Sequence, residues 1–281
     1  MNITTKSKIE IQMLEPKSNI DIMHMLTSIS PTIGNTLVGR SVLVNSDFFK
    51  VLPFVKSKSV DVICTDMPFN TTKCKWDTKI DLPKMWNEYK RIIKDRGVII
   101  LFAQTPFDKV LGASNIKWLK YEWIWEKTSA TGHLNAKKMP MKAHENILVF
   151  YKKTPAFYPQ KTTGHIRKVS KAEHKIKCIE SEVYNKGQKL TSYDSTERYQ
   201  RSVLKYPSDK QKKNGLKMHP TQKPFALVEE ILKSYTNENS FVLDNCMGSN
   251  TTGAVCQKLN ILYLGIEKEK EWYDISVRRV S

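Results

Sequence analysis

Near its C-terminus the chain carries the stretch Phe241-Val242-Leu243-Asp244-Asn245-Cys246-Met247-Gly248-Ser249-Asn250-Thr251-Thr252. Its first residues are apolar and end in an acid, which predicts a buried strand. The small residues that follow let backbone amides approach a ligand closely, and the threonines open a helix whose N-terminus favours negative charge. The stretch therefore predicts a strand, a ligand-binding turn and a helix, with a nucleotide-like molecule at the turn.

A second apolar run, residues 261–266, leads into Glu267, which lies 23 residues after Asp244. Doubly wound folds often place a ribose-binding carboxylate about 20 residues after their glycine-rich turn. A structural alternative stays open, because any strand-helix-strand unit can contain such a turn and a surface glutamate. A dinucleotide site of the NAD type is disfavoured, since the three-glycine motif Gly-X-Gly-X-X-Gly is missing from this turn.

Apolar strands alternate with amphipathic helices along most of the chain. Short apolar or β-branched runs predict strands at residues 60–65, 98–103, 146–151, 240–244 and 261–267. Asp81 and Pro83 predict the start of a helix that Gly97 ends, and a second helix is predicted to begin at Pro224. This alternation is typical of an α/β fold with a doubly wound, mainly parallel sheet covered on both faces.

The charge of the chain is strongly basic. Its 281 residues include 46 Lys and Arg against 28 Asp and Glu, a formal charge of +18. Such an excess predicts a polyanionic partner, because neutralising phosphates releases condensed counterions. Residues 152–217 carry +11 of this charge together with interleaved tyrosines, a mixture suited to phosphate contact and base stacking. A solvated basic loop is the alternative interpretation of this segment.

The five cysteines form no Cys-X-X-Cys pair and have no histidine spacing suited to zinc, so no metal site is expected. Their odd number is typical of a reduced, cytoplasmic compartment. Charged residues interrupt the N-terminus where a secretory signal needs an apolar stretch, and the best apolar run, residues 97–103, is too short to cross a bilayer. A soluble, intracellular protein without membrane contact is expected.

The predicted strand at residues 60–65 runs into a second turn, Asp66-Met67-Pro68-Phe69. Asp66 and the backbone carbonyl of Pro68 could each accept a hydrogen bond from one hydrogen of an exocyclic base amine, which would draw the nitrogen lone pair out of conjugation. Phe69 could stack on a base that has been flipped out of a helix. The structural alternative is an ordinary proline turn after a strand.

Taken together, these stretches resemble the DNA amino-methyltransferases. Asp66-Met67-Pro68-Phe69 resembles their Asp-Pro-Pro-Tyr motif, residues 244–252 resemble their S-adenosylmethionine loop, and His219-Pro220-Thr221-Gln222-Lys223-Pro224 looks like the segment that precedes that loop. The order of these motifs is that of the β group of the family. The resemblance implies an S-adenosylmethionine-dependent, Rossmann-like methyltransferase domain over residues 39–281, with residues 152–217 as a basic target-recognition insertion. Residues 1–38 form an N-terminal extension of unknown role.

The family pattern assigns roles to individual positions. It implies a catalytic turn at Asp66, Met67, Pro68 and Phe69. It implies cofactor contacts at Asp47, His219, Pro220, Thr221, Gln222, Lys223, Pro224, Asp244, Met247, Gly248, Ser249, Asn250, Thr251 and Glu267. DNA contacts are expected at Lys75, Trp76, Arg198 and Arg201. Asp47 has the alternative role of a helix cap, and Pro224 that of a helix start, while Lys127 and Glu145 are expected to be architectural.

Three positions depart from the family pattern. Met67 replaces a proline, which loosens the turn, and Phe69 replaces a tyrosine but keeps its stacking face. Asn250 stands where a second glycine is expected and brings a side chain close to the ligand. Asparagine tolerates left-handed backbone angles, so the loop is expected to keep its shape. Cofactor affinity is the property that this departure puts in question.

The resemblance implies a sequence-specific DNA methyltransferase that modifies N6 of adenine in double-stranded DNA by base flipping, as in restriction-modification systems. Aspartate rather than serine at the head of the motif favours adenine, with N4 of cytosine as the close alternative. A catalytically silent nucleic-acid-binding subunit and an RNA methyltransferase are further alternatives. Relatives of this group often form dimers, so a homodimer is a family expectation.

Overall fold

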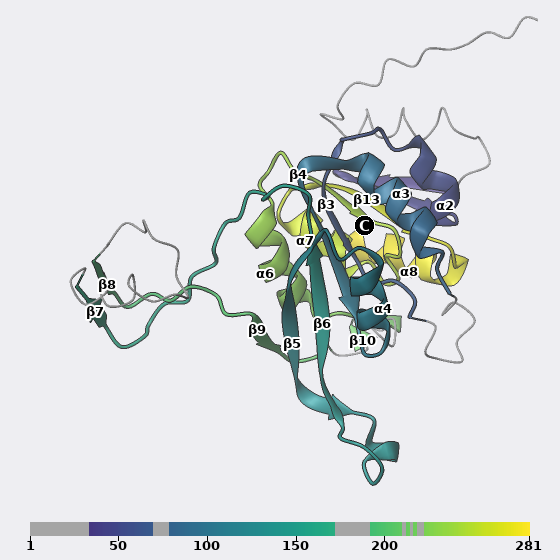
Figure 1. The fold of residues 1–281 in the computed structure, drawn as a ribbon. Coiled ribbons are helices and arrows are strands. Elements are labelled where there is room, and N and C mark those ends of the chain that lie inside the picture. The colour runs from purple at the N-terminus through teal and green to yellow at the C-terminus, as the bar shows by residue number, and fades with distance from the viewer. Residues whose placement is uncertain (1–33, 70–78, 172–191, 210–211, 214–215, 218–221) are drawn as a thin grey trace, which may run out of the picture. The chain divides into compact units, whose positions relative to one another are not determined.

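The computed structural model describes residues 34–69, 79–171, 192–209, 212–213, 216–217 and 222–281 (Figure 1). These residues divide into two compact units. The larger combines residues up to Phe157 with Ser202–Ser281, and the smaller spans Tyr158–Arg201. Among the described residues, no helix is long and apolar enough to cross a membrane.

The larger unit is built on a nine-stranded sheet with the order β1-β2-β13-β12-β3-β4-β6-β5-β9. The strands are β1 (Gly34–Val38), β2 (Ser41–Asn45), β3 (Val60–Thr65), β4 (Ile93–Ala103), β5 (Leu119–Thr131), β6 (Lys142–Phe150), β9 (Val203–Tyr206), β12 (Phe241–Asp244) and β13 (Leu262–Glu267). Strands β2, β13, β12, β3 and β4 are mutually parallel, and β6 runs antiparallel between β4 and β5. The predicted mainly parallel α/β sheet is confirmed.

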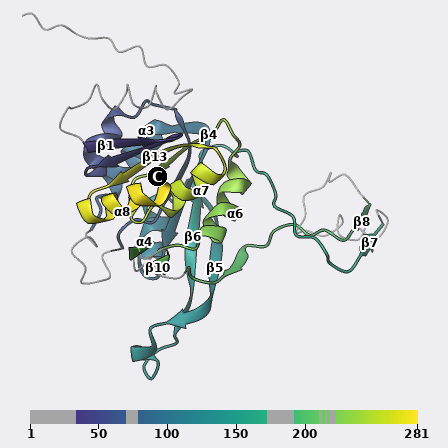
Figure 2. The same cartoon turned by 180° about the vertical axis from the view of Figure 1, so that it is seen from behind.

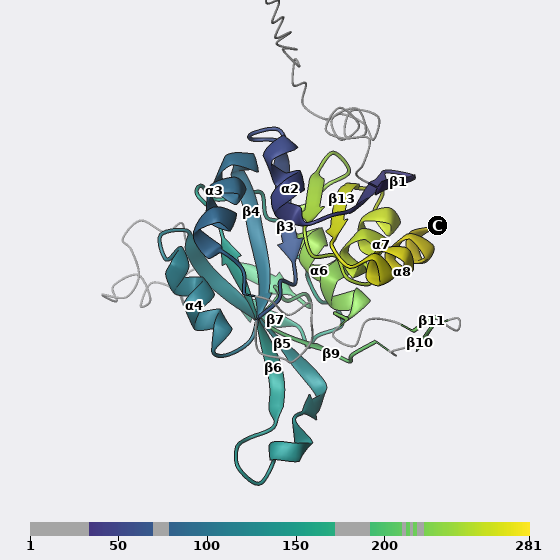
Figure 3. The same cartoon turned by 90° about the vertical axis from the view of Figure 1, so that its right-hand side faces the viewer.

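Helices cover both faces of this sheet, as Figure 3 shows. One face packs against α2 (Phe48–Val51), α3 (Leu82–Ile92) and α4 (Phe107–Ser114), and the other against α6 (Phe225–Tyr235), α7 (Thr251–Lys258) and α8 (Lys270–Val280). The view from behind brings the second group to the front (Figure 2). Successive strand residues point to opposite faces, so Ile63 and Leu243 join one core cluster while Val62 and Val242 join the other.

Helix α3 shows how local sequence sets an element. The Asp81 carboxylate caps it by accepting a hydrogen bond from the Lys84 amide at 3.0 Å, and Pro83 lies in its first turn. Its buried stripe is Met85, Trp86, Tyr89 and Ile92. The predicted end at Gly97 was wrong, because Ile93 takes extended backbone angles and pairs with Val60 to begin β4.

Two predicted boundaries also change. Residues 34–38 lie in the predicted N-terminal extension but form β1, which pairs with β2, so the sheet begins before residue 39. The predicted insertion at 152–217 contains the smaller unit, where β7 (Lys168–Ser170) pairs with β8 (Tyr193–Ser195). Its later part belongs to the main sheet, because Leu204 of β9 is buried and pairs with Trp125 of β5; β10 (Lys212–Lys213) and β11 (Leu216–Lys217) form a separate hairpin.

Strands β3 and β12 are neighbours at the centre of the sheet, and their connections leave in opposite directions. Strand β3 continues through α3 to β4, whereas β12 continues through α7 to β13 on the other side. Ligands of doubly wound folds bind at such a switch point, outside the carboxyl ends of the strands. The two turns singled out in the sequence lie at these two carboxyl ends.

Candidate active site

A cavity of about 530 Å³ opens at the carboxyl ends of β3 and β12, within the size range of small-molecule sites. It brings together most of the residues predicted from the sequence. Those lining it are Asp47, Asp66, Met67, Pro68, Phe69, Gln222, Lys223, Asp244, Met247, Gly248, Ser249, Thr251 and Glu267. Pro224 and Asn250 do not line it. His219, Pro220, Thr221, Lys75 and Trp76 lie outside the described residues.

Asp66 follows the last residue of β3, and its two carboxylate oxygens differ. Oδ2 lies 2.7 Å from Nζ of Lys223. Oδ1 is buried and has no hydrogen-bond partner among the residues that the structure describes. Burial raises the pKa of Asp66, and the Lys223 ammonium opposes this rise. Because an unsatisfied buried acceptor is costly, Oδ1 is the oxygen that an N–H of a ligand would satisfy.

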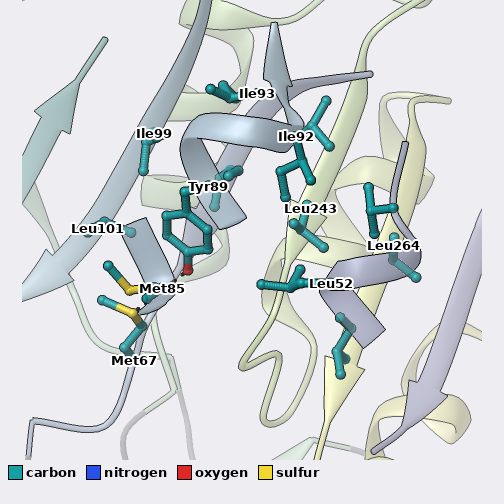
Figure 4. Packing of buried hydrophobic residues seen from close by; sticks show 14 of the residues in the cluster. Leu52, Met67, Met85, Tyr89, Ile92, Ile93, Ile99, Leu101, Leu243 and Leu264 are labelled. Carbon is teal, nitrogen blue, oxygen red and sulfur yellow. Dashed lines mark hydrogen bonds between the residues drawn. The ribbon is translucent and has the colours of Figure 1, made fainter. Parts of the chain in front are cut away.

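Met67 anchors the turn rather than loosening it. Its side chain is 2% exposed and packs in the core beside Met85 and Tyr89 (Figure 4). The Tyr89 hydroxyl lies 3.8 Å from its sulfur. Apolar packing therefore replaces the stiffness of the family's proline, and the Met67 side chain is directed into the core.

Phe69 lies at the cavity with its ring stacked on Phe107, the first residue of α4. The ring centroids are 5.3 Å apart at an interplanar angle of 27°. Both Phe69 and Pro68 are partly exposed. This arrangement fixes one aromatic face at the edge of the cavity, beside the Asp66 carboxylate.

The turn after β12 keeps the expected shape. Gly248 and Asn250 both have left-handed backbone angles, with φ of 51° and 62°. The Asn250 Oδ1 accepts a hydrogen bond from the Gly253 amide at 3.1 Å and so caps α7. The Asn250 side chain is buried and turned toward its own helix. The helix cap therefore turns this side chain toward α7, and Asn250 does not line the cavity.

Two carboxylates border this turn, Asp244, which is buried, and Glu267, which is partly buried. Asp244 accepts a hydrogen bond from the Cys246 amide at 3.2 Å, and burial raises its pKa to about 7, a rise that the nearby side chains of Thr65 and Thr252 oppose. Glu267 accepts the Gly248 amide at 2.9 Å and lies at the end of β13; burial also raises its pKa. A cationic ligand group placed near these carboxylates would offset the cost of their burial.

Three other predicted residues start a helix, cap one or connect two segments. The Asp47 carboxylate caps α2 by accepting the Phe49 amide at 2.8 Å, although it also lines the cavity. Pro224 immediately precedes α6, as expected of a helix start. Gln222 accepts a hydrogen bond of 3.2 Å from the Ser249 hydroxyl, which joins the segment before α6 to the turn after β12.

Comparison with known proteins agrees with this arrangement. The family model of the N6/N4 DNA methylases matches residues 60–278. The chain belongs to this DNA methylase family. It is 25% identical over 256 residues to the Type II methyltransferase M.HpaI of Haemophilus parainfluenzae, covering 85% of this chain and 74% of that protein. It is also 25% identical over 273 residues to M.HinfI of Haemophilus influenzae, covering 85% and 67%.

Solved structures support the fold of this methylase. The M1.HpyAVI complex with S-adenosylmethionine aligns with a TM-score of 0.56 and 24% identity, over 84% of this chain and 98% of that one. The cytosine-N4-specific PvuII DNA methyltransferase aligns with a TM-score of 0.60 and 14% identity, over 88% and 90%. Both are similar to this methylase in the arrangement of the sheet and its helices.

Some supporting residues of the methylase were not predicted. Arg279 of α8 donates to the Ser249 carbonyl at 2.9 Å and to the Thr251 hydroxyl at 3.0 Å. Asp209 accepts hydrogen bonds from the Gln222 side chain at 3.1 Å and from the Phe225 amide at 3.0 Å. No local pattern marks either residue, because each acts on a segment far away in the sequence.

The arginines predicted to contact DNA lie in or at the end of the smaller unit. Arg198 is partly buried and donates to the carbonyls of Ser195 and Glu197 at 3.0 and 2.7 Å. Its guanidinium therefore holds the local fold of that unit. Arg201 is exposed, so its guanidinium is the more accessible of the two for phosphate contact.

Proposed function

We propose that this DNA methylase transfers the methyl group of S-adenosylmethionine to N6 of an adenine flipped out of double-stranded DNA. The observation that carries the proposal is the position of Asp66. Its Oδ1, which has no hydrogen-bond partner in the described part of the chain, lies at the carboxyl end of β3, in the same cavity as the glycine turn and Glu267. The same cavity thus contains a hydrogen-bond acceptor for an amine, at Asp66, and a turn suited to binding a nucleotide, at Gly248.

The residues of the cavity fit S-adenosylmethionine. When bound, this cofactor supplies an activated methyl group on a sulfonium centre. The carboxylates of Asp244 and Glu267 suit its positive charge and its ribose hydroxyls, and the left-handed turn at Gly248 lets the backbone approach closely. Gln222 and Ser249 line the same cavity and would also contact the ligand. Asp47 borders the same cavity near the start of α2.

The chain's own residues then act on the base. Asp66 accepts one amine hydrogen and the Pro68 carbonyl accepts the other, which draws the nitrogen lone pair out of the ring. The Asp66 carboxylate stabilises the positive charge that develops on the nitrogen as its bond to the methyl carbon forms. The nitrogen then loses one of its two hydrogens as a proton, which leaves a neutral methylated amine. Phe69, already braced by Phe107, offers a face on which the flipped base can stack. Neither step requires a covalent intermediate with the protein.

Aspartate at the head of the catalytic turn favours adenine by family analogy. Cytosine N4 is the second candidate, since a cytosine-N4-specific enzyme is among the structures with this fold. Both bases present an exocyclic amine to the same two acceptors, so the mechanism is shared. The packing of Met67 and the cap formed by Asn250 support an active enzyme, because each departure from the family pattern has a structural counterpart.

A hairpin arm offers a surface for the DNA. Residues 142–145 of β6 run past Ala103, the end of β4, and with β5 they form an arm that extends from the sheet at the edge where Asp66 lies (Figure 1). Residues 128–144 contain three lysines and no acidic residue, and residues 131–144 are exposed. We infer that DNA lies against this arm, and that the smaller unit contributes to target recognition.

The function is tested by incubating the protein with unmethylated genomic DNA and S-adenosylmethionine. The DNA is digested to nucleosides, and 6-methyladenine and 4-methylcytosine are measured by mass spectrometry. We expect 6-methyladenine from the wild type and none from Asp66→Ala, while the cofactor Kd of the variant changes less than about threefold, because the carboxylate acts on the base. Formation of 4-methylcytosine would change the base, and product from matched RNA alone would change the substrate. Absence of both product and cofactor binding would contradict the proposal.

A further inference from the structure

Asp66, whose side chain is 25% exposed, is the first member of a largely buried chain of four charges. Lys223 Nζ lies 2.7 Å from Asp66 Oδ2 and 3.0 Å from Glu145 Oε2, and Lys127 Nζ lies 2.7 Å from Glu145 Oε1. The side chains of Lys223, Glu145 and Lys127 are 8%, 12% and 8% exposed. Four separate segments supply them: the turn after β3, the segment before α6, β6 and β5.

We propose that Lys223 and Glu145 are positioning residues: Lys223 keeps the Asp66 carboxylate ionised and leaves its Oδ1 for the target amine, and Glu145 offsets the charge of Lys223. This inference rests on the proposed function of the cavity. The family pattern implies a cofactor contact for Lys223 and an architectural role for Glu145. The geometry instead joins both residues to the carboxylate that acts on the base.

The ammonium of Lys223 fixes two parts of the catalytic turn together. It occupies Oδ2 of Asp66, so Oδ1 is the oxygen that remains without a partner among the described residues. It also lies 5.9 Å from the ring centroid of Phe69 and 5.3 Å from that of Phe102, within the range of cation–π attraction. One buried cation therefore sets the carboxylate and the stacking ring relative to each other.

Glu145 offsets the repulsion that the Lys223 ammonium alone would exert on the methylated amine. A cation 2.7 Å from Asp66 stabilises the ionised carboxylate, but it also repels the positive charge that develops on the amine during transfer. Glu145 shares the Lys223 ammonium and offsets its field, and Lys127 neutralises the other oxygen of Glu145. The charges alternate in sign, so Asp66 stays ionised while the chain has no net positive charge.

The protonation tendencies of the four groups agree with this arrangement. Burial disfavours the charged form of Lys223, yet the carboxylates of Asp66 and Glu145 raise its pKa. Burial would raise the pKa of Glu145, but Lys223 and Lys127 hold it below its ordinary value. Besides Lys223, the charged groups that face Asp66 are Glu145, Lys127 and, from β12, Asp244. Among all the charged groups, Lys223 lowers the pKa of Asp66 most strongly, and Glu145 raises it.

The test measures the Asp66 carboxyl directly. Protein labelled with ¹³C at aspartate side chains is titrated by NMR without cofactor, and Asp66→Asn identifies the resonance. We expect Lys223→Met to raise the pKa of Asp66, because the neighbouring cation is removed, and Glu145→Gln to lower it, because a neighbouring anion is removed. Lys258→Met, which removes the exposed lysine of an ion pair between α7 and Glu229 of α6, is the matched control and should leave the titration unchanged.

Methyl transfer is then measured across pH with the same proteins. We expect kcat to fall about 10²-fold in Lys223→Met and its acid limb to move to higher pH, with Lys223→Arg recovering part of the loss. In Glu145→Gln the acid limb should move to lower pH while the plateau falls. The cofactor Kd should change less than about threefold in each variant, since neither residue is assigned to the cofactor.

The outcomes separate the two proposals. If the pKa of Asp66 rises in Lys223→Met and falls in Glu145→Gln, but the protein forms no methylated base, the roles of Lys223 and Glu145 toward Asp66 are upheld and the proposed function is overturned. An Asp66 titration that moves in neither variant, or a Kd that rises more than tenfold in Lys223→Met with an unchanged pH profile, would return Lys223 to a cofactor role. If Lys223→Met fails to fold, Glu145→Gln and Lys223→Arg decide the question by the same two measurements.

Discussion

The Tyr89 hydroxyl donates a 2.6 Å hydrogen bond to the side-chain oxygen of Asn245. Tyr89 belongs to α3, which packs on Met67 of the turn after β3, whereas Asn245 directly follows β12 and begins the glycine turn. The pair is buried. One phenol thus ties the two halves of the candidate active site together through the core rather than through the cavity.

Replacement of Tyr89 by Phe tests this link. The variant keeps the packing of the ring but leaves the Asn245 oxygen buried without its donor, so we expect a loss of about 1–3 kcal/mol in the free energy of unfolding. The cofactor Kd should rise as well, because the turn loses a fixed point. Urea denaturation and calorimetry measure the two effects. Tyr199→Phe alters an exposed tyrosine and should change neither; equal effects in both variants would contradict the link.

Two substitutions of Asn250 distinguish the contribution of its left-handed backbone from that of its helix cap. Asn250→Gly keeps the left-handed angle and loses only the cap, which costs a few tenths of a kcal/mol. Asn250→Ala loses the cap and strains the backbone, so about 2 kcal/mol of stability should be lost. Thermal unfolding of the two variants measures the difference. The cofactor Kd of Asn250→Gly should stay near the wild-type value, and a large rise would place the Asn250 side chain in the ligand site.

Asp244 should make stability depend on pH. Burial raises its pKa to about 7 from an ordinary 3.8, so the folded state holds a proton that the unfolded state has released. Stability therefore falls as pH rises from about 4 to about 7 and stays low above that. Asp244→Asn mimics the neutral form and should gain on the wild type over this window, by at most about 4 kcal/mol.

Urea denaturation at several pH values measures this gain. Asp95→Asn is an opposite-sign control, because the hydrogen bond from Lys58 lowers the pKa of Asp95 to about 2. That variant should be less stable than the wild type at neutral pH, and the difference should vanish as pH falls below the Asp95 pKa. A constant gap between Asp244→Asn and the wild type across pH would contradict the raised pKa.

The sequence was sufficient for those parts of the site that local pattern encodes. Each of the strands at residues 60–65 and 240–244 has an apolar run that ends at an acid, and parallel neighbours bring those ends together. The cap at Asp81 and the left-handed turn at Asn250 likewise follow from residue type and position. In each case the information lies within a few residues of the element that it specifies.

The remaining parts depend on contacts between distant segments. Lys223 stands in a stretch that resembles a cofactor segment, and nothing nearby indicates that its ammonium reaches Asp66 and Glu145. Met67 looks like a weakened turn until the pocket formed by Met85 and Tyr89 is known. Strand β9 lies in a polar, basic region, and only its pairing with β5 indicates where it belongs. Tertiary packing decides these roles, and the periodicity of the sequence cannot predict such packing.

The arm formed by β5 and β6 should contribute to DNA binding through its charge. Lys137 and Lys138 lie at its exposed end, close to the exposed side chains of Leu134 and Met139. If each lysine neutralises one phosphate, the double variant Lys137→Gln/Lys138→Gln should bind duplex DNA more weakly and reduce the slope of log K against log salt by about 2. Fluorescence anisotropy between about 50 and 200 mM salt measures this slope. Lys258→Gln removes a charge from α7 and should leave the slope unchanged, whereas Arg201→Gln reports on the smaller unit independently. An unchanged slope in the double variant, with a reduced slope in Arg201→Gln, would move the DNA from the arm to the smaller unit.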